Sequence, residues 1–370
     1  MTLAAAIEQT LSELSIKTQT PLQTDLFTTV EQERKAARRR KGLFVLSDRT
    51  ELTLTGKDRA SFLHGFCTND INKLPVGHSC EAFITSIKGR ALGHVWVTAF
   101  ENRLLLEGSP NQSETLLPHL KKYIIMEDVQ LEETSTSRDL LYLVGPETVD
   151  LIAKLNLVID VVHRGMTVTI AANELLGCED HGDVNIDVIA QDWLGEPGLL
   201  FRVPCEVSGL VWQKLVELNA EPCGRETWER MRVESKFPHY GQDITEQNIC
   251  QEVGRTEQAI SFRKGCYLGQ EPIARLDALG HVNKELTLLQ IACDSDTTLD
   301  DLTATDVILE ESEKSLGQLS SIVFRPDYAD ALALCYLRNA GKAADAKLLL
   351  QAKDGRCYPV QVLNEPQTSL

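Results

Sequence analysis

The chain has 370 residues, of which 43% are hydrophobic and 25% charged, enough for two or three domains with substantial cores. Its formal net charge of -17 argues against direct nucleic-acid binding, because phosphate contacts need clustered lysine and arginine. No run of about eighteen apolar residues occurs, so we expect no membrane-spanning helix. The N-terminus resembles neither a secretory signal nor a transit peptide. We therefore expect a globular cytoplasmic protein.

The ten cysteines are spread singly along the chain without a CxxC pair, which indicates reduced thiols. Three His/Cys pairs are close in sequence but belong to no recognisable four-ligand pattern: His64 with Cys67, His78 with Cys80, and Cys178 with His181. We therefore expect no bound metal.

Residues 1–40 are predicted to form a helical extension, because Leu3, Ile7, Leu11 and Leu14 have helical spacing. Its end carries the basic run Arg34–Lys41 (RKAARRRK). Such a run is typical of the solvated face of a helix, although it could also bind an acidic partner.

Residues 41–138 are predicted to form a first ferredoxin-like α+β unit. Residues 42–47 and 51–56 are typical of short strands, and a helix that follows buries Phe62, Leu63 and Phe66. Residues 81–108 then indicate three antiparallel strands, followed by a helix over 113–123 and a strand near Val129. Strand, helix, strands, helix, strand is the ferredoxin-like order.

Residues 139–284 repeat this order as a second ferredoxin-like unit. A strand over 139–145 leads into a helix over 147–155, and further strands are expected around Val168, Val188 and Leu200. Two helices, 208–218 and 225–234, follow. The crevice between two such units is the default ligand site. Residues 285–370 change to short strands with turns, which predicts a small C-terminal β-barrel.

Three motifs then carry a resemblance: GKDRASFLHGFCTNDINKLPVG (56–77), RVESKFPHYGQDI (232–244) and KGCYLGQE (264–271). In this order they resemble the YgfZ-type folate-binding proteins, which are relatives of the glycine-cleavage T-protein, an aminomethyltransferase. The resemblance covers the chain from about Gly42 to Leu350.

The resemblance implies two ferredoxin-like units and a terminal barrel around a central opening that holds tetrahydrofolate or a one-carbon derivative. It also implies support of iron-sulfur cluster assembly or repair. The expected partners are therefore folate and iron-sulfur enzymes, such as those that modify tRNA, or cluster assembly proteins.

Glu234 matches the folate-binding glutamate of the T-protein pattern, in which Tyr240, Gly241 and Asp243 also match. A single carboxylate can accept the adjacent N–H and amino donors of a pterin in a paired geometry. The alternative is a surface glutamate beside Arg232 in the last turn of a helix.

Cys266 stands between Gly265 and Tyr267 in the KGCYLGQE motif, and the family resemblance makes this thiol important for function. It is a reactive or cluster-sensing thiol, a packed loop residue, or a transient metal ligand. Lys264 is the nearest positive charge that could favour a thiolate. The nearest histidine in sequence is His281, so Cys-His catalysis has no local support.

Four further residues complete the candidate site. Arg263 and Lys264 could attract the glutamate tail of folate. Asn69 and Asp70 are expected in a loop where they cap backbone N–H groups, with a direct ligand contact as the alternative. Residues 270–275, which begin with the last two residues of the motif, are predicted to form a strand that leads to a turn at Gly280.

The sequence departs from the T-protein at Gly93 and His94, which stand where that enzyme has an aspartate pair. A glycine cannot move a proton, and a histidine differs from aspartate in reach and charge. Aminomethyl transfer is therefore in doubt, although His94 could serve as a base. A third possibility is an interaction scaffold whose acidic surface docks basic partners.

Overall fold

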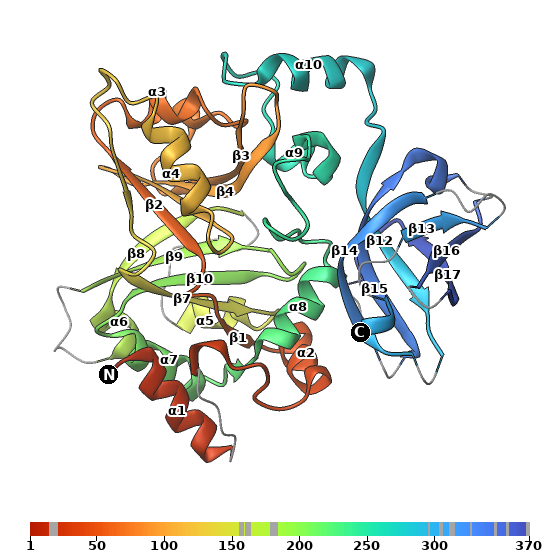
Figure 1. The fold of residues 1–370 in the computed structure, drawn as a ribbon. Coiled ribbons are helices and arrows are strands. Elements are labelled where there is room, and N and C mark those ends of the chain that lie inside the picture. The colour runs from red at the N-terminus through yellow and green to blue at the C-terminus, as the bar shows by residue number, and fades with distance from the viewer. Residues whose placement is uncertain are drawn as a thin grey trace.

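The computed structural model describes residues 1–14, 21–154, 159, 164–177, 184–294, 297–302, 306–310, 315–325, 328–343, 346–352 and 355–367. They form a mixed α+β architecture with a six-stranded sheet, a five-stranded sheet and a closed six-stranded barrel (Figure 1). None of the described helices is both long and apolar enough to cross a membrane.

The six-stranded sheet has the order β11-β1-β7-β10-β9-β8. Its strands are β1 (Gly42–Val45), β7 (Arg138–Val144), β8 (Thr167–Ala171), β9 (Asn185–Gln191), β10 (Gly198–Pro204) and β11 (Glu221–Pro222). β1 pairs antiparallel with β7 and parallel with β11. The sequence analysis grouped this strand with the first unit, but Leu43 and Phe44 pack into the cores on the two faces of the six-stranded sheet.

Helices cover both faces of this sheet. On one face α1 and α7 lie side by side, and the core contains Leu3, Ile7 and Trp212 (Figure 1). The helices that contribute to this core are α1 (Leu3–Glu13), α5 (Thr148–Lys154), α6 (Ala172–Leu176) and α7 (Ser208–Glu217). On the other face lie α2 (Val30–Arg39) and α8 (Arg225–Glu234), whose Trp228 packs with Phe44.

The five-stranded sheet has the order β3-β4-β5-β2-β6. Its strands are β2 (Thr50–Thr55), β3 (His78–Thr85), β4 (Ala91–Ala99), β5 (Leu104–Gly108) and β6 (Gln130–Glu133). α3 (Arg59–His64) and α4 (Ser113–Lys121) pack on one face, against Val95 and Val97 of β4. Because side chains alternate along a strand, Trp96 of β4 faces the other way and joins the core of the six-stranded sheet.

The barrel predicted for the C-terminal part is confirmed. It closes in the order β12-β15-β14-β13-β16-β17 and lies beside α8 (Figure 1). Its strands are β12 (Lys284–Ala292), β13 (Asp306–Leu309), β14 (Ser315–Arg325), β15 (Asp330–Arg338), β16 (Leu348–Gln351) and β17 (Cys357–Leu363), and α11 (Leu299–Leu302) lies between β12 and β13.

The connection from α8 to the barrel contains α9 (Thr256–Ala259) and α10 (Gln270–Leu279). The prediction of a strand after the KGCYLGQE motif is wrong, because these residues form α10. Gly269, with φ 81°, caps the helix, and Pro272 lies in its first turn, where no intrahelical N–H bond is lost. Only Ile273 of this helix is buried, although Leu276 and Leu279 follow it at helical spacing.

Candidate functional site

The KGCYLGQE loop lies against the segment that follows α3, so the structure brings the first and third motifs together. The Nζ of Lys264 donates to the carbonyl oxygens of His64 at 2.5 Å and Cys67 at 2.6 Å. Beyond Cys266, the N–H of Leu268 donates to the Gly65 carbonyl at 2.9 Å. Cys266 itself is exposed, whereas Lys264 is buried, and burial lowers the pKa of its ammonium group.

Asn69 and Asp70 have different roles beside this loop. The Asn69 Oδ1 accepts the N–H of Asp70 at 2.8 Å, and its Nδ2 donates to the Glu81 and Gln258 carbonyls at 2.8 and 3.1 Å. Asn69 therefore satisfies backbone groups, as predicted. Asp70 caps no N–H with its side chain, and its carboxylate lies 3.4 Å from the Nδ1 of His64 and 3.2 Å from the Nζ of Lys73.

His64 is a residue that sequence reasoning missed. A Cβ on Gly265 would lie 3.5 Å from the Nε2 of His64, so the imidazole faces the loop backbone immediately before Cys266. Burial lowers the pKa of His64, and the charges of Lys264 and Lys73 act in the same direction against Asp70. The Nδ1 of His64 also accepts the N–H of Asn72 at 3.5 Å, so the imidazole lies between this segment and the KGCYLGQE loop.

Glu234 is fully buried and is surrounded by arginines. The Nε of Arg34 lies 2.9 Å from both carboxylate oxygens, the Nε of Arg230 donates at 3.1 Å, and the Nη2 of Arg38 at 3.4 Å. The interpretation of Glu234 as a surface glutamate is therefore wrong. The solvated-face interpretation of the basic run is also wrong for Arg34 and Arg38, which are 2% and 5% exposed. Their acidic partner belongs to the same chain.

Tyr240 and Arg263 lie apart from this carboxylate. The hydroxyl of Tyr240 donates to the Ala91 carbonyl at 3.3 Å, and its ring packs against the cluster that contains Tyr267. Burial raises the pKa of Tyr240. Arg263 is exposed on the loop before Lys264. Tyr240 therefore links the loop after α8 to β4.

Gly93 and His94 lie inside the protein on β4. The Nε2 of His94, which is 1% exposed, lies 2.7 Å from the Oε1 of Glu81. Glu81 also accepts from Arg255 at 2.7 Å and Arg164 at 2.9 Å. Burial lowers the pKa of His94, although its hydrogen bond with Glu81 opposes this shift. A Cβ on Gly93 would lie 2.7 Å from Leu116 Cδ2, so an aspartate there requires repacking.

A cavity of about 400 Å³ opens beside the C-terminal end of α8. It is bounded by Trp193 and Arg164 from the side of the six-stranded sheet and by Ser235 and Arg255 from the connection to the barrel. Chain that follows β17 forms another wall, through Glu365 and Pro366, and the N–H of Gln367 donates to the Glu234 carbonyl at 2.7 Å. Residues beside the six-stranded sheet, the connection to the barrel and the segment after β17 therefore meet at this cavity.

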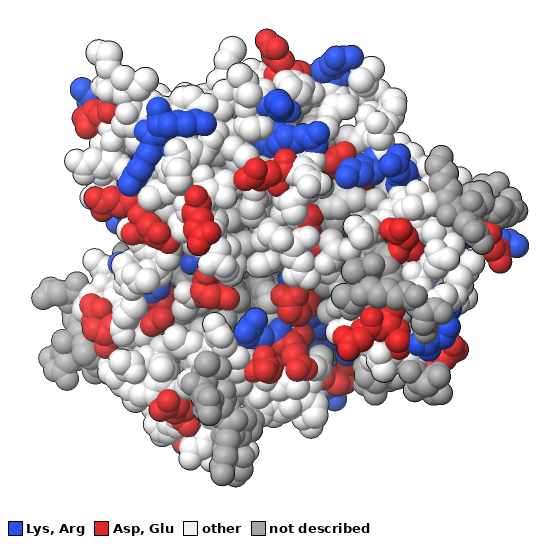
Figure 2. Space-filling view, in the orientation of Figure 1, with Lys and Arg blue, Asp and Glu red and all other residues white. Residues whose placement is uncertain are grey.

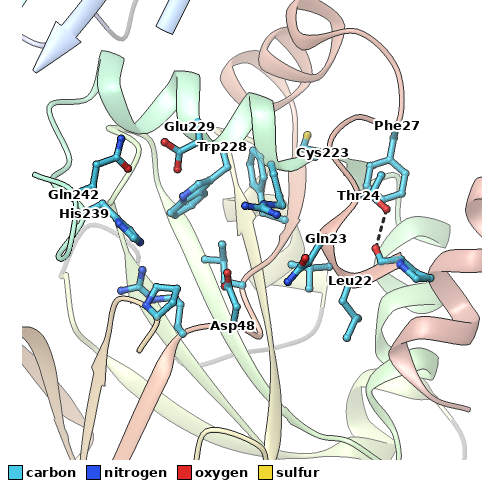
Figure 3. A pocket seen from close by; sticks show the side chains of 18 residues that line it. Leu22, Gln23, Thr24, Phe27, Asp48, Cys223, Trp228, Glu229, His239 and Gln242 are labelled. Carbon is cyan, nitrogen blue, oxygen red and sulfur yellow. Dashed lines mark hydrogen bonds between the residues drawn. The ribbon is translucent and has the colours of Figure 1, made fainter. Parts of the chain in front are cut away.

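A second cavity, of about 350 Å³, lies between α8 and the N-terminal segment (Figure 3). Trp228 and Glu229 descend into it from α8, with His239 and Gln242 at one side and Asp48 opposite (Figure 3). At its far end Thr24 donates to the Pro21 carbonyl at 2.8 Å. None of the motif residues assigned above to ligand or thiol chemistry lines either cavity.

Surface charge and metal-ligating side chains indicate no further candidate site among the described residues. On the face drawn in Figure 2, basic side chains occur in small groups between acidic ones. Among the described residues, no three His, Cys, Asp or Glu side chains are grouped to hold a metal. The Cys178 and His181 pair lies outside the described residues.

Comparison with known proteins shows which family the chain resembles. The GCVT N-terminal domain family matches residues 8–264. A protein of Arabidopsis thaliana named "Putative transferase, chloroplastic" is 27% identical over 265 residues, 68% of this chain and 56% of that protein. An aminomethyltransferase of Exiguobacterium sibiricum is 27% identical over 221 residues, 60% of this chain and 59% of that enzyme.

The chain thus aligns with less than two thirds of the length of these curated relatives. Among solved structures, the glycine cleavage system aminomethyltransferase T of Bartonella henselae superposes with a TM-score of 0.76 at 18% identity. That match covers 92% of this chain and 89% of the other, and it shows a shared fold. Because the family match spans more than half of the sequence, the chain belongs to the GCVT N-terminal domain family.

Proposed function

We propose that the protein is a tetrahydrofolate-binding accessory protein of the YgfZ type, which supports the assembly or repair of iron-sulfur clusters. In this proposal, the two α+β parts are ferredoxin-like units, and the folate site lies where the second of them meets the connection to the barrel and the segment after β17. The observation that carries the proposal is the exposed thiol of Cys266 on a loop clamped by a buried lysine, in a family member that lacks the aspartate pair.

The cavity beside α8 is the proposed folate site. Its volume of about 400 Å³ lies within the range of about 300–1,000 Å³ usual for small-molecule sites. The indole of Trp193 offers a flat apolar wall for a pterin ring. Arg164 on the same side and Arg255 from the connection to the barrel are suited to the carboxylates of folate.

Glu234 must exchange a partner if it is to accept the donors of a pterin. Its carboxylate already receives hydrogen bonds from three arginines. Arg38 makes the longest of these contacts, at 3.4 Å, and it also donates to the Leu194 carbonyl and to the Ser235 hydroxyl. Arg38 is therefore the guanidinium that a pterin displaces at least cost.

The alternative function is folate-dependent aminomethyl transfer, which the similarity to the Exiguobacterium sibiricum aminomethyltransferase favours. It requires a group that handles protons at the position of the aspartate pair. His94 is almost fully buried there and is bonded to Glu81, which itself holds two arginines. The accessory role therefore fits the site better than the enzyme.

The folate part is tested by calorimetric titration of tetrahydrofolate into the wild type and four variants. We expect Cys266→Ser to bind like the wild type, Glu234→Gln to lose binding, and Arg38→Met to bind at least as tightly because Glu234 is released. Glu229→Gln is the matched control, since it removes another carboxylate from the same helix. This carboxylate is partly exposed and pairs with Arg232. Absence of binding in the wild type refutes a folate site.

The iron-sulfur part is tested in cells that lack the protein, with and without oxidative stress. We expect reduced activity of iron-sulfur enzymes, restored by the wild type and not by Cys266→Ser. Unchanged activity in both conditions contradicts the accessory role. Turnover of an aminomethyl donor on a lipoyl carrier, with tetrahydrofolate, would instead establish the enzyme.

A further inference from the structure

We infer that Lys236 binds small polar aldehydes by forming an imine through its amino group, in a cavity between the end of α8 and the barrel. The inference goes beyond the proposed function, because it needs neither folate nor the thiol of Cys266. Nothing in the comparisons assigns a role to this lysine.

Lys236 has a backbone conformation that the end of a helix usually gives to glycine. Its φ is +54°, in the left-handed region that residues with a Cβ rarely adopt. Two backbone hydrogen bonds close α8 around it: the N–H of Lys236 donates to the Val233 carbonyl at 3.0 Å, and the N–H of Phe237 donates to the Arg232 carbonyl at 2.7 Å. This helix end therefore fixes the direction in which the lysine side chain leaves the backbone. A residue other than glycine in such a strained conformation is a feature that clusters at functional sites.

The side chain of Lys236 lines a cavity of about 500 Å³, which lies within the range of about 300–1,000 Å³ usual for small-molecule sites. Polar side chains of the barrel line it as well, among them Thr287 of β12, Gln361 of β17 and Asn364 after β17. These hydroxyl and amide groups favour a ligand that has hydrogen-bonding groups of its own. No described residue lines both this cavity and the proposed folate site.

The amino group of Lys236 makes neither a hydrogen bond nor an ion pair with any described residue. A Cβ on Gly254 would lie 3.6 Å from the Nζ of Lys236 and 3.1 Å from the Oε1 of Glu285, so both groups lie beside the same glycine without pairing. The other carboxylate oxygen of Glu285 pairs with the Nζ of Lys342 at 2.7 Å. The nearby carboxylate is therefore already engaged, and the amine of Lys236 is left to face the cavity.

The surroundings of this amine favour its neutral, nucleophilic form. Burial lowers the pKa of Lys236, and the charges of Lys342 and Arg255 act in the same direction, whereas Glu285 opposes them. The overall shift of the pKa is downward, so a larger fraction of this amine is unprotonated near pH 7 than in an exposed lysine. Only the unprotonated amine has the lone pair that attacks a carbonyl carbon.

The reaction forms a carbon-nitrogen double bond and releases one water molecule. The lone pair of Nζ attacks the aldehyde carbon and gives a carbinolamine. The two hydrogens of the amine then leave with the former aldehyde oxygen as water, and the imine remains. This step is reversible and transfers no electrons. Cyanoborohydride traps the imine, because it delivers a hydride to the carbon while water supplies a proton to the nitrogen, and the product is a stable secondary amine.

The experiment treats the full chain with glycolaldehyde and cyanoborohydride and measures the labelling rate of each lysine by peptide mass spectrometry between about pH 6 and pH 10. Lys347 is the internal reference, because its side chain is 76% exposed and pairs with Glu310 at the surface. Near pH 7 we expect Lys236 to be labelled about tenfold faster than Lys347. Its rate should saturate as the aldehyde concentration rises, because the cavity binds the aldehyde first. The advantage should shrink toward pH 10, where exposed lysines also lose their proton.

Two variants change the charges around the amine in opposite directions. Glu285→Gln removes the carboxylate that opposes the downward pKa shift, so labelling of Lys236 near pH 7 should rise by about threefold. Lys342→Met removes a cation and frees Glu285, so labelling should fall by about threefold. An unchanged Lys347 rate and circular dichroism spectrum show that a variant is folded; where a variant fails this check, the wild-type pH profile decides.

Two results overturn the inference. The first is a wild-type Lys236 that is labelled no faster than Lys347 at any pH. The second is a labelling rate that rises linearly with glycolaldehyde concentration for both lysines, which would show an adventitious reaction only. Equal labelling by propanal, which is similar in size but has no hydroxyl, would overturn the preference for polar aldehydes. Because the assay contains no folate, its outcome is separate from that of the proposed function.

Discussion

Replacement of Glu234 by glutamine tests whether the buried arginine cluster depends on this one carboxylate. The substitution keeps the size of the side chain but removes its charge. The four contacts, at 2.9, 2.9, 3.1 and 3.4 Å, would sum to about 6–12 kcal/mol if each charge-assisted bond were independent. They share one carboxylate, and the desolvation of the ions opposes them. We therefore expect a loss of about 3–5 kcal/mol, the usual cost of breaking a buried ion pair.

The assay is urea unfolding, followed by tryptophan fluorescence and by circular dichroism to check that both report one transition. Glu229→Gln is the control, since its side chain is 42% exposed and its partner Arg232 keeps Asp243 at 2.9 Å. We expect the control to change the free energy of unfolding by no more than about 1 kcal/mol.

A double-mutant cycle completes the test. Arg38→Met removes the guanidinium with the longest contact to Glu234, so the double variant should recover part of the loss, with a coupling of about 1–3 kcal/mol. If Glu234→Gln costs less than about 1 kcal/mol, the arginines are stabilised by something other than this carboxylate, and the account of the cluster is refuted.

Three further predictions concern β3, β4 and the thiol loop. His94→Asp should not create aminomethyl transfer, and measurable transfer activity would refute this prediction. The substitution places a second buried carboxylate beside Glu81, so it should lower the free energy of unfolding by about 3 kcal/mol. Burial alone would raise the pKa of Glu81, but the hydrogen bonds from Arg255 and His94 lower this pKa overall. The stability that ionised Glu81 gives the folded protein is therefore complete above the pKa of a glutamate in the unfolded chain, about 4.3, and is lost as the pH falls below that value. Unfolding measured between about pH 6 and pH 3 should therefore show a shallower loss in Glu81→Gln than in the wild type, and equal slopes would count against this origin. Gly269→Ala would place a Cβ 2.2 Å from the Ser86 carbonyl oxygen, so we expect faster amide hydrogen exchange in the KGCYLGQE loop and α10. Gly280→Ala is the milder control, because a Cβ at that position meets no atom within 4 Å.

Much of the local structure was predictable because it depends on nearby residues. The helices expected over 208–218 and 225–234 form as α7 and α8, and the barrel begins within one residue of the predicted position. These elements have strong apolar periodicity and clear breaks at their ends. α10 was predicted as a strand although Gly269 and Gly280 flank it, because its segment is short, buries only Ile273 and carries Pro272 in its first turn.

The contacts that define the site were not predictable in the same way. Arg34 and Glu234 are 200 positions apart, as are Lys264 and the carbonyl of His64. A run of arginines has the same composition whether it faces water or a buried carboxylate, and only the packing of α2 against α8 distinguishes the two. The motifs identified the segments that matter, while the structure determined which of their atoms meet.

The pairing of β1 also affects how the chain is made. This strand leaves the ribosome early, but its partners β7 and β11 begin at Arg138 and Glu221. At a synthesis rate of about 5–20 residues per second, roughly 10–40 s pass between the synthesis of β1 and that of β11, its second neighbour. During that time the apolar Leu43 and Phe44 stand on an open strand edge, which is a template for unwanted association. Nascent chains of this protein should therefore need protection by a chaperone until the segment through β11 has emerged.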